Sequence, residues 1–328
     1  MFNFFKRKKH NAPSRHEPPQ TTHSTTSPDG GQPSSAVPPV DASVSSAFSI
    51  DDPLAAEVYL AFQTDQVQLP ALPDVAARVR TMISDPDVSF DQVAQLLQAD
   101  MAMTGKLITV ANSPRFGGVA PVASCQAAIG RLGLKGTQDL AVSMALSRMF
   151  FARDVGVRTA LKALWEHSIL VAATASELAQ QTNGVVDPDE AMLGGLIHDV
   201  GTLAILNHLN TDRTRRYSPD EITRVVAALR GRLGSEILRQ WQFEERIVRC
   251  AEHAENRGWR SGKLEPVELV IVAQAYSMID PADSASHASL LQLPTFKRLP
   301  ICAEGVESGL QALLELRPRI EATMNVFR

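Results

Sequence analysis

Residues 187–205 have the sequence DPDEAMLGGLIHDVGTLAI, and this stretch decides the fold class. Its first four residues supply a helix cap, a proline suited to the first helical position and carboxylates for the first turn. The apolar residues after them continue without the strict alternation of a strand. The stretch therefore predicts a buried helix, with the adjacent pair His198 and Asp199 near its end.

Helix signals of the same kind recur from about residue 52 onward. Residues 218–221 repeat the cap, proline and carboxylates of residues 187–190, and Ser89 with Gln92 forms a capping-box pattern. A long periodic segment from about 157 to 181 is followed by an Asn-Gly pair, which favours a left-handed residue after a helix. No segment alternates with a period of two for long enough to indicate a sheet. The sequence predicts an all-α protein.

We expect four segments along the chain. Residues 1–51 are rich in Pro, Ser and Thr and poor in large apolar groups, which is typical of a disordered arm. The helical remainder is expected to form an N-terminal lobe at 52–155, a second lobe at 156–290 and a helical extension at 291–328.

Composition limits the possible functions. The 328 residues carry a formal net charge of −4, with 44% hydrophobic and 21% charged residues, as in a soluble globular protein. The sequence contains no run of about 18 apolar residues, the length that a membrane-spanning helix needs. The start of the chain does not have the order of a secretory signal. Three distant cysteines predict a reducing compartment rather than a disulfide framework. We therefore expect a cytoplasmic protein.

The charge is unevenly distributed along the chain. The first 50 residues contain five basic and three acidic residues, so the rest of the chain carries a net charge of −6. The basic segment with Arg213, Arg215 and Arg216 could bind a nucleic acid, although such a segment is also typical of a solvated loop. The aromatic and basic start of the chain could touch a membrane weakly or stay solvated. Neither feature is a strong signal for a nucleic acid or a membrane.

The pair His198-Asp199 is the strongest candidate for chemistry. Imidazole and carboxylate groups both ligate divalent cations, and an antiparallel neighbouring helix could bring His167 close to the pair. These three residues are the candidate metal ligands. The alternative is a His-Asp pair that forms a hydrogen bond inside a helical core. The residues alone leave both open.

Residues from about 65 to 290 resemble the HDOD domain, a helical relative of the HD phosphohydrolases that occurs in bacterial signalling proteins. Several independent stretches occur in the right order, which is more specific than a lone His-Asp pair. The stretches are LPALP (69–73), SFDQVAQLLQADMAMTGKLITVANS (89–113), QAAIGRLGLKGTQDLAVSMAL (126–146), LWEHSILVAATASELA (164–179), EAMLGGLIHDVGTLAI (190–205) and RLGSEILRQWQF (232–243). The resemblance implies that the lobe at 156–290 is HD-like.

The resemblance also indicates which ligands are missing. Catalytic HD enzymes need a first His, the HD pair and a later Asp; His167, His198 and Asp199 match the first three by position. Where HD-GYP relatives carry a further His, this chain has Arg230, and where they carry a His pair it has CAEHAE at 250–255. The last Asp is expected near VAQAY at 272–276, which contains no carboxylate. The resemblance therefore implies an incomplete set for catalysis.

The vacated ligand position leads to a hypothesis for Arg230. Its guanidinium could bind Asp199 and supply the positive charge that a metal would give. The alternative is an exposed arginine at a helix end. His253 with Glu255 could rebuild a metal site or belong to a solvated helix face.

Two functions are compatible with these observations. The first is a non-catalytic HDOD module of bacterial signal transduction, which retains His167, His198, Asp199 and Arg230 as a remnant site and needs no cofactor. Such a module would act through protein partners or sense a ligand such as a nucleotide. The second is a metal-dependent HD-type phosphohydrolase or phosphodiesterase for a nucleotide or cyclic dinucleotide, with a divalent metal on His167, His198 and Asp199. Fold alone does not choose between them.

Overall fold

The regular secondary structure of the described residues is entirely helical, which confirms the predicted all-α class. The computed structural model describes residues 50–64, 70–113, 116, 120–150, 155–211, 215–280 and 283–327. The predicted disordered arm lies outside the described residues up to residue 49.

The helices follow one another with short connections. Their bounds are α1 (Pro53–Gln63), α2 (Asp74–Ile83), α3 (Phe90–Gln98), α4 (Met101–Ala111), α5 (Cys125–Ser147), α6 (Val155–Gln180), α7 (Pro188–Ile197), α8 (Val200–Thr211), α9 (Pro219–Gln240), α10 (Glu245–His253), α11 (Pro266–Tyr276), α12 (Ser284–Leu291), α13 (Val306–Glu315) and α14 (Arg317–Phe327). Short 3₁₀ helices occur at Arg148–Phe150, Phe296–Arg298 and Pro300–Cys302. No helix among the described residues is both long and apolar enough to cross a membrane.

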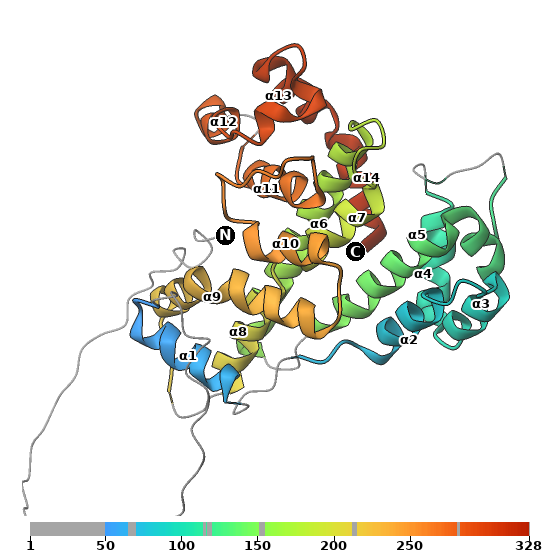
Figure 1. Ribbon diagram of the computed structural model, residues 1–328, viewed down its shortest axis with the longest axis horizontal. Coiled ribbons are helices and arrows are strands. Elements are labelled where there is room, and N and C mark those ends of the chain that lie inside the picture. The colour runs from blue at the N-terminus through green and yellow to red at the C-terminus, as the bar shows by residue number, and fades with distance from the viewer. Residues whose placement is uncertain are drawn as a thin grey trace, which may run out of the picture. The chain divides into compact units, whose positions relative to one another are not determined.

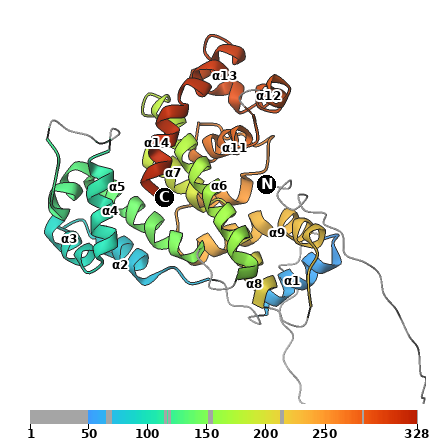
Figure 2. The same cartoon turned by 180° about the vertical axis from the view of Figure 1, so that it is seen from behind.

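Two groups of helices surround α5 and α6. Helices α2, α3 and α4 pack on α5, while α7, α8, α11 and α14 pack on α6 (Figure 1). Helix α9 contacts α8 on one side and α10 on another, and the view from behind shows α6 running past α7 and α11 (Figure 2). Residues 52–328 form one compact unit. The division into an N-terminal and an HD-like lobe stays a prediction.

The helix starts that the sequence indicates are present. Asp187 accepts hydrogen bonds from the backbone N–H groups of Asp189 and Glu190 at the start of α7. Ser218 with Glu221 forms the capping box of α9, and α3 begins with a second capping box. Each cap satisfies N–H groups that the helix leaves unpaired, so the boundaries are local properties of the sequence.

Two glycines let neighbouring helices approach until their backbones touch. A Cβ on Gly195 would lie 2.5 Å from Ala172 Cα, in the backbone of α6. A Cβ on Gly201 would lie 2.0 Å from the carbonyl oxygen of Arg230, in the backbone of α9. Any larger residue would push the two helices apart at either place. The link between α7 and α8 is therefore held between α6 and α9.

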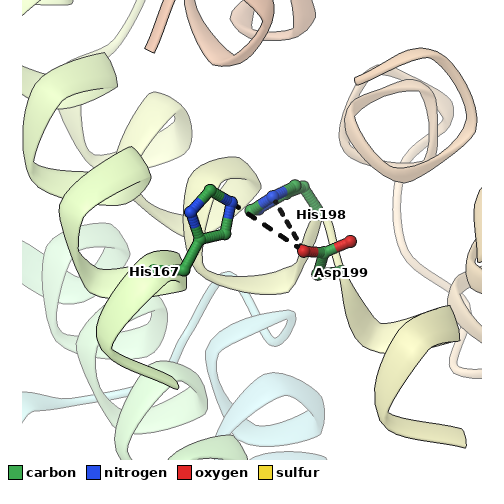
Figure 3. Close-up of side chains that lie close together, drawn as sticks. All are labelled: His167, His198 and Asp199. Carbon is green, nitrogen blue, oxygen red and sulfur yellow. Dashed lines mark ion pairs between the residues drawn. The ribbon is translucent and has the colours of Figure 1, made fainter. Parts of the chain in front are cut away.

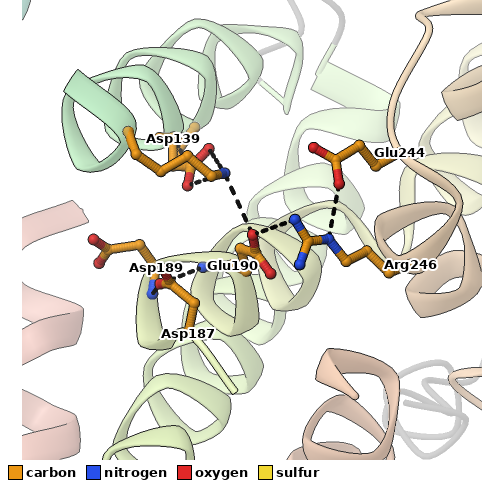
Figure 4. A network of polar contacts seen from close by, with 8 residues as sticks. Asp139, Asp187, Asp189, Glu190, Glu244 and Arg246 are labelled. Carbon is orange, nitrogen blue, oxygen red and sulfur yellow. Dashed lines mark hydrogen bonds and ion pairs between the residues drawn. The ribbon is translucent and has the colours of Figure 1, made fainter. Parts of the chain in front are cut away.

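A polar network around the buried carboxylates of Asp139 and Glu190 joins α5 to α7 and α10 (Figure 4). Lys135 Nζ lies 2.9 Å from Asp139 Oδ2 and 3.7 Å from Glu190 Oε1. Arg246 Nη2 binds the same Glu190 oxygen at 2.9 Å, and its Nε binds Glu244 at 2.8 Å. Burial raises the pKa of Asp139 to about 6, although the charge of Lys135 opposes the shift. The carboxylate of Asp139 is therefore held at an electrostatic cost.

We expect Gly201→Ala to lower the free energy of unfolding by more than about 3 kcal/mol, because the added methyl group collides with the backbone of α9. Gly105→Ala in α4 is the control: no atom lies within 4 Å of its added Cβ, and alanine is the better helix former by about 1 kcal/mol. Urea unfolding followed by circular dichroism measures both. A Gly201→Ala protein as stable as the wild type would contradict the backbone contact.

Asp139→Asn is expected to change the pH dependence of stability. The pKa of Asp139 in the folded protein lies above its usual value of 3.8. The contribution of this residue to the free energy of unfolding is therefore fully present below about pH 4 and is lost as the pH rises through about 6. At pH 7.5 the variant should be more stable than the wild type by about 2–3 kcal/mol, and near pH 4 the two should agree. Urea unfolding across this range measures the difference. The exposed Asp87→Asn is the control, and a difference that does not vary with pH would refute the expectation.

Candidate functional site

Three side chains from two parts of the chain meet at the candidate site (Figure 3). His167 comes from α6, and His198 and Asp199 lie in the link between α7 and α8. Asp199 Oδ2 lies 3.4 Å from His198 Nε2 and 3.9 Å from His167 Nε2. One ligand atom of each residue lies within 4.8 Å of the others. The structure thus brings together the three residues that the sequence singled out.

The close contact between α6 and α7 positions this triad of His167, His198 and Asp199. Gly195 lies against Ala172, so the end of α7 is held directly on the helix that carries His167. The rings of His167 and His198 are consequently neighbours, with centroids 5.3 Å apart. A side chain at position 195 would push α7 away from α6 and so move the two imidazoles apart.

Hydrogen bonding selects which nitrogen of His198 faces Asp199. His198 Nδ1 lies 2.6 Å from the carbonyl oxygen of Gly195 and donates to it, because a carbonyl can only accept. Nε2 therefore points toward Asp199. His167 Nε2, His198 Nε2 and Asp199 Oδ2 are buried and have no hydrogen-bond partner among the described residues. Three unsatisfied atoms that face one another need a proton or another cation between them.

The two imidazoles differ in their affinity for a proton. Burial, reinforced by the charge of His198, lowers the pKa of His167 to about 4. Burial also opposes the charged form of His198, but the neighbouring Asp199 carboxylate and the Gly195 carbonyl outweigh it and raise the pKa of His198. Burial of Asp199 is likewise outweighed by His198 and Arg230, which lower its pKa. In the absence of a metal, the proton of the site therefore belongs to His198.

Arg230 reaches the site from α9. Its Nη1 lies 3.9 Å from Asp199 Oδ1, which is longer than a hydrogen bond but short enough for an ion pair. The same oxygen accepts a hydrogen bond of 3.1 Å from Thr202. Arg230 is buried, so the alternative of an exposed arginine at a helix end is wrong. Its role as a substitute for a metal stays a prediction.

Glu255 and Gln274 also belong to this site, although no firm role could be predicted for either from the sequence. Glu255 Oε2 lies 2.6 Å from Arg230 Nη2, while its Oε1 accepts a hydrogen bond of 2.6 Å from Gln274 Nε2. Gln274 lies on α11 in the segment where the resemblance expects the final Asp. Its side chain also opposes, in part, the lowering of the His167 pKa. An amide stands there instead of a carboxylate. The spacing of this segment was the available signal for Gln274.

The other candidates from the sequence lie elsewhere. His253 stacks on Trp259 with ring centroids 3.7 Å apart and does not join a group of metal ligands. Arg215 pairs with Glu221, and its guanidinium lies 5.1 Å from the centre of the Tyr217 ring. Arg213 lies outside the described residues. Within the described part of the chain, His167, His198 and Asp199 are the one group of three or more potential metal ligands.

The chemistry of the triad fits a divalent cation. Two imidazole nitrogens and one carboxylate oxygen are buried without a hydrogen-bond partner in the described part of the chain, and such donors bind Zn²⁺, Mn²⁺ or Fe²⁺. His167, His198 and Asp199 would hold the ion, which would activate water for hydrolysis when bound. Arg230 and Gln274 add neither a carboxylate nor an imidazole. The surroundings thus supply three ligands rather than a full catalytic set.

Comparison with known proteins places the chain in a family. The model of the HDOD domain matches residues 69–257, which is more than half of the chain. A crystal structure named as a "putative metal-dependent phosphohydrolase" from Shewanella amazonensis is 23% identical, with a TM-score of 0.73 and coverage of 84% of this chain and 98% of that one. A "putative signal transduction protein" from Marinobacter aquaeolei is 16% identical, with a TM-score of 0.53 and coverage of 85% and 67%. These likenesses show a shared fold.

An uncharacterized protein from Treponema pallidum is 24% identical over 189 residues, or 55% of this chain. The match spans only 36% of the length of that relative.

The site geometry predicts separate titrations for the two histidines. In protein treated with a chelator, His167 should stay neutral down to about pH 4, whereas His198 should keep its proton above the ordinary histidine pKa of 6.5. Histidine ¹⁵N and ¹³C chemical shifts recorded against pH measure both, with His167→Asn and His198→Asn used to assign the signals. Titration of both residues near pH 6.5 would contradict the arrangement.

Proposed function

This chain belongs to the HDOD domain family, and we propose that it is a non-catalytic regulatory module of bacterial signal transduction. In this proposal the HD-type site is retained as a ligand-sensing or structural element, and the helical surface binds protein partners. A cytoplasmic location is part of the proposal. So is the division of the domain into an N-terminal lobe at 52–155 and an HD-like lobe at 156–290.

One observation carries the proposal: the buried neighbours of the His167–His198–Asp199 triad are a guanidinium and an amide. Arg230 and Gln274 stand at positions where related enzymes are expected to have metal ligands. A guanidinium repels a cation and an amide adds no charge, so both weaken the metal activation that hydrolysis needs. The name of the Marinobacter relative is consistent with a role in signalling.

A second function has its own support. The three buried atoms, which have no hydrogen-bond partner among the described residues, fit a metal ion, and the Shewanella relative is named as a "putative metal-dependent phosphohydrolase". The alternative is therefore an HD-type phosphohydrolase or phosphodiesterase that acts on a nucleotide or cyclic dinucleotide. It would need at least one further ligand from the substrate or from water.

Turnover measurements separate the two functions. The purified full chain, with its metal content determined, is supplied with Mn²⁺ or Fe²⁺ and assayed on a cyclic dinucleotide and on bis(p-nitrophenyl) phosphate. We expect the wild-type chain to hydrolyse both substrates no faster than His198→Ala does, with either metal. Turnover that His198→Ala abolishes and His253→Ala retains would overturn the proposal in favour of the enzyme. His253 is the matched control because its ring stacks on Trp259, away from the triad.

A further inference from the structure

Arg230 stands between two carboxylates and contacts them unequally. Its Nη2 lies 2.6 Å from Glu255 Oε2, whereas its Nη1 lies 3.9 Å from Asp199 Oδ1. Asp199 is the buried partner, while 52% of the Glu255 side chain is exposed. Burial strengthens an ion pair at a given distance, so the closer contact would be expected on Asp199. The guanidinium is instead drawn toward the carboxylate that faces solvent.

Gln274 fixes the position of Glu255. The Gln274 amide donates to Glu255 Oε1, so each oxygen of this carboxylate has its own partner on a different helix. Arg230 and Gln274 are both about nine-tenths buried. Glu255 is thus held at the edge of the site by two side chains that are themselves fixed by packing.

The main chains that carry Arg230 and Asp199 lie close together. The carbonyl of Arg230 lies against Gly201, two residues after Asp199, so the two main chains are in direct contact. Only a change in side-chain torsions is then needed to bring the guanidinium about 1 Å closer to Asp199. The contact with Glu255 is the shorter of its two carboxylate contacts.

The position of this guanidinium matters for the opposite side of Asp199. Asp199 Oδ2 faces His167 Nε2 and His198 Nε2, and these three atoms have no hydrogen-bond partner among the described residues. A cation on them depends on the negative charge of Asp199. A guanidinium that closes on Asp199 would neutralise that charge and repel the cation.

We propose that the Arg230–Glu255 ion pair controls the affinity of the His167–His198–Asp199 site for a divalent cation. Glu255 keeps the guanidinium away from Asp199 and thereby keeps the site able to bind the ion. Arg230 is the competitor for Asp199, and Glu255 is a positioning residue that acts through it. This inference rests on the proposed function, in which the triad is retained as a regulatory site.

Binding of Mn²⁺ to the full chain, measured by isothermal titration calorimetry and by the electron paramagnetic resonance signal of free Mn²⁺, tests the proposal. Arg230→Met should raise the affinity at least about tenfold, because the competing charge is gone. Glu255→Gln should lower it about tenfold, because the guanidinium closes on Asp199. In the Arg230→Met background, Glu255→Gln should change the affinity by less than about threefold.

The double variant distinguishes an effect through Arg230 from a direct effect of charge. Glu252→Gln removes the same charge from α10, but Glu252 pairs with Arg239 at 2.8 Å, so its effect should be less than about twofold. If Glu255→Gln lowers the affinity for Mn²⁺ equally in the wild type and in Arg230→Met, the proposal is overturned. So would the absence of Mn²⁺ binding in both the wild type and Arg230→Met.

Folding of each variant is checked by circular dichroism and thermal unfolding. If Arg230→Met does not fold, Arg230→Lys takes its place, because lysine keeps the charge but cannot bind two carboxylates with one planar group. Its affinity for Mn²⁺ should then depend less on Glu255 than that of the wild type. The outcome is independent of turnover: phosphodiesterase activity would refute the proposed function, whereas a missing coupling between Arg230 and Glu255 would refute this inference.

Discussion

Gly195 and Gly201 stand on either side of His198 and Asp199, and both touch the backbone of another helix. Gly195 rests on Ala172 in α6, and Gly201 rests on the carbonyl of Arg230 in α9. These contacts leave no room for a side chain, so four helices have a fixed arrangement around the His-Asp pair. His167 and Arg230 reach Asp199 because their helices are held at backbone contact. The site therefore depends on two residues that have no side chain.

With the backbone fixed, charge decides the properties of the site. Asp199 uses one oxygen toward the two histidines and the other toward Thr202 and Arg230. The buried carboxylate thus has two possible sources of positive charge, a cation on the histidine side or the guanidinium on the other. Glu255 and Gln274 lie on the side of the guanidinium and influence that balance. A regulatory role fits a site whose occupancy can shift with a single side chain.

Local patterns were sufficient for the helices and for the triad. The capping box at Ser218, the side-chain cap at Asp187 and the proline after each act within one helical turn. Their effect on helix starts could therefore be predicted from the sequence. His198 and Asp199 are adjacent, and His167 follows from the preceding helix. Glu255 and Gln274 were harder to assign because they lie on separate elements, and an exposed glutamate in a charged segment resembles many solvated residues.

The sequence by itself determined an all-helical chain, its helix starts and the residues able to ligate a metal, because these properties depend on residue type and on neighbours within a few positions. The tertiary structure decided which side chains surround Asp199. Arg230 is buried, not exposed, and it binds Glu255 more closely than Asp199. That outcome depends on a difference of about 1 Å between two contacts of Arg230 on α9, one to the link between α7 and α8 and the other to the turn after α10. Such distances are set by helix packing, which no local pattern encodes.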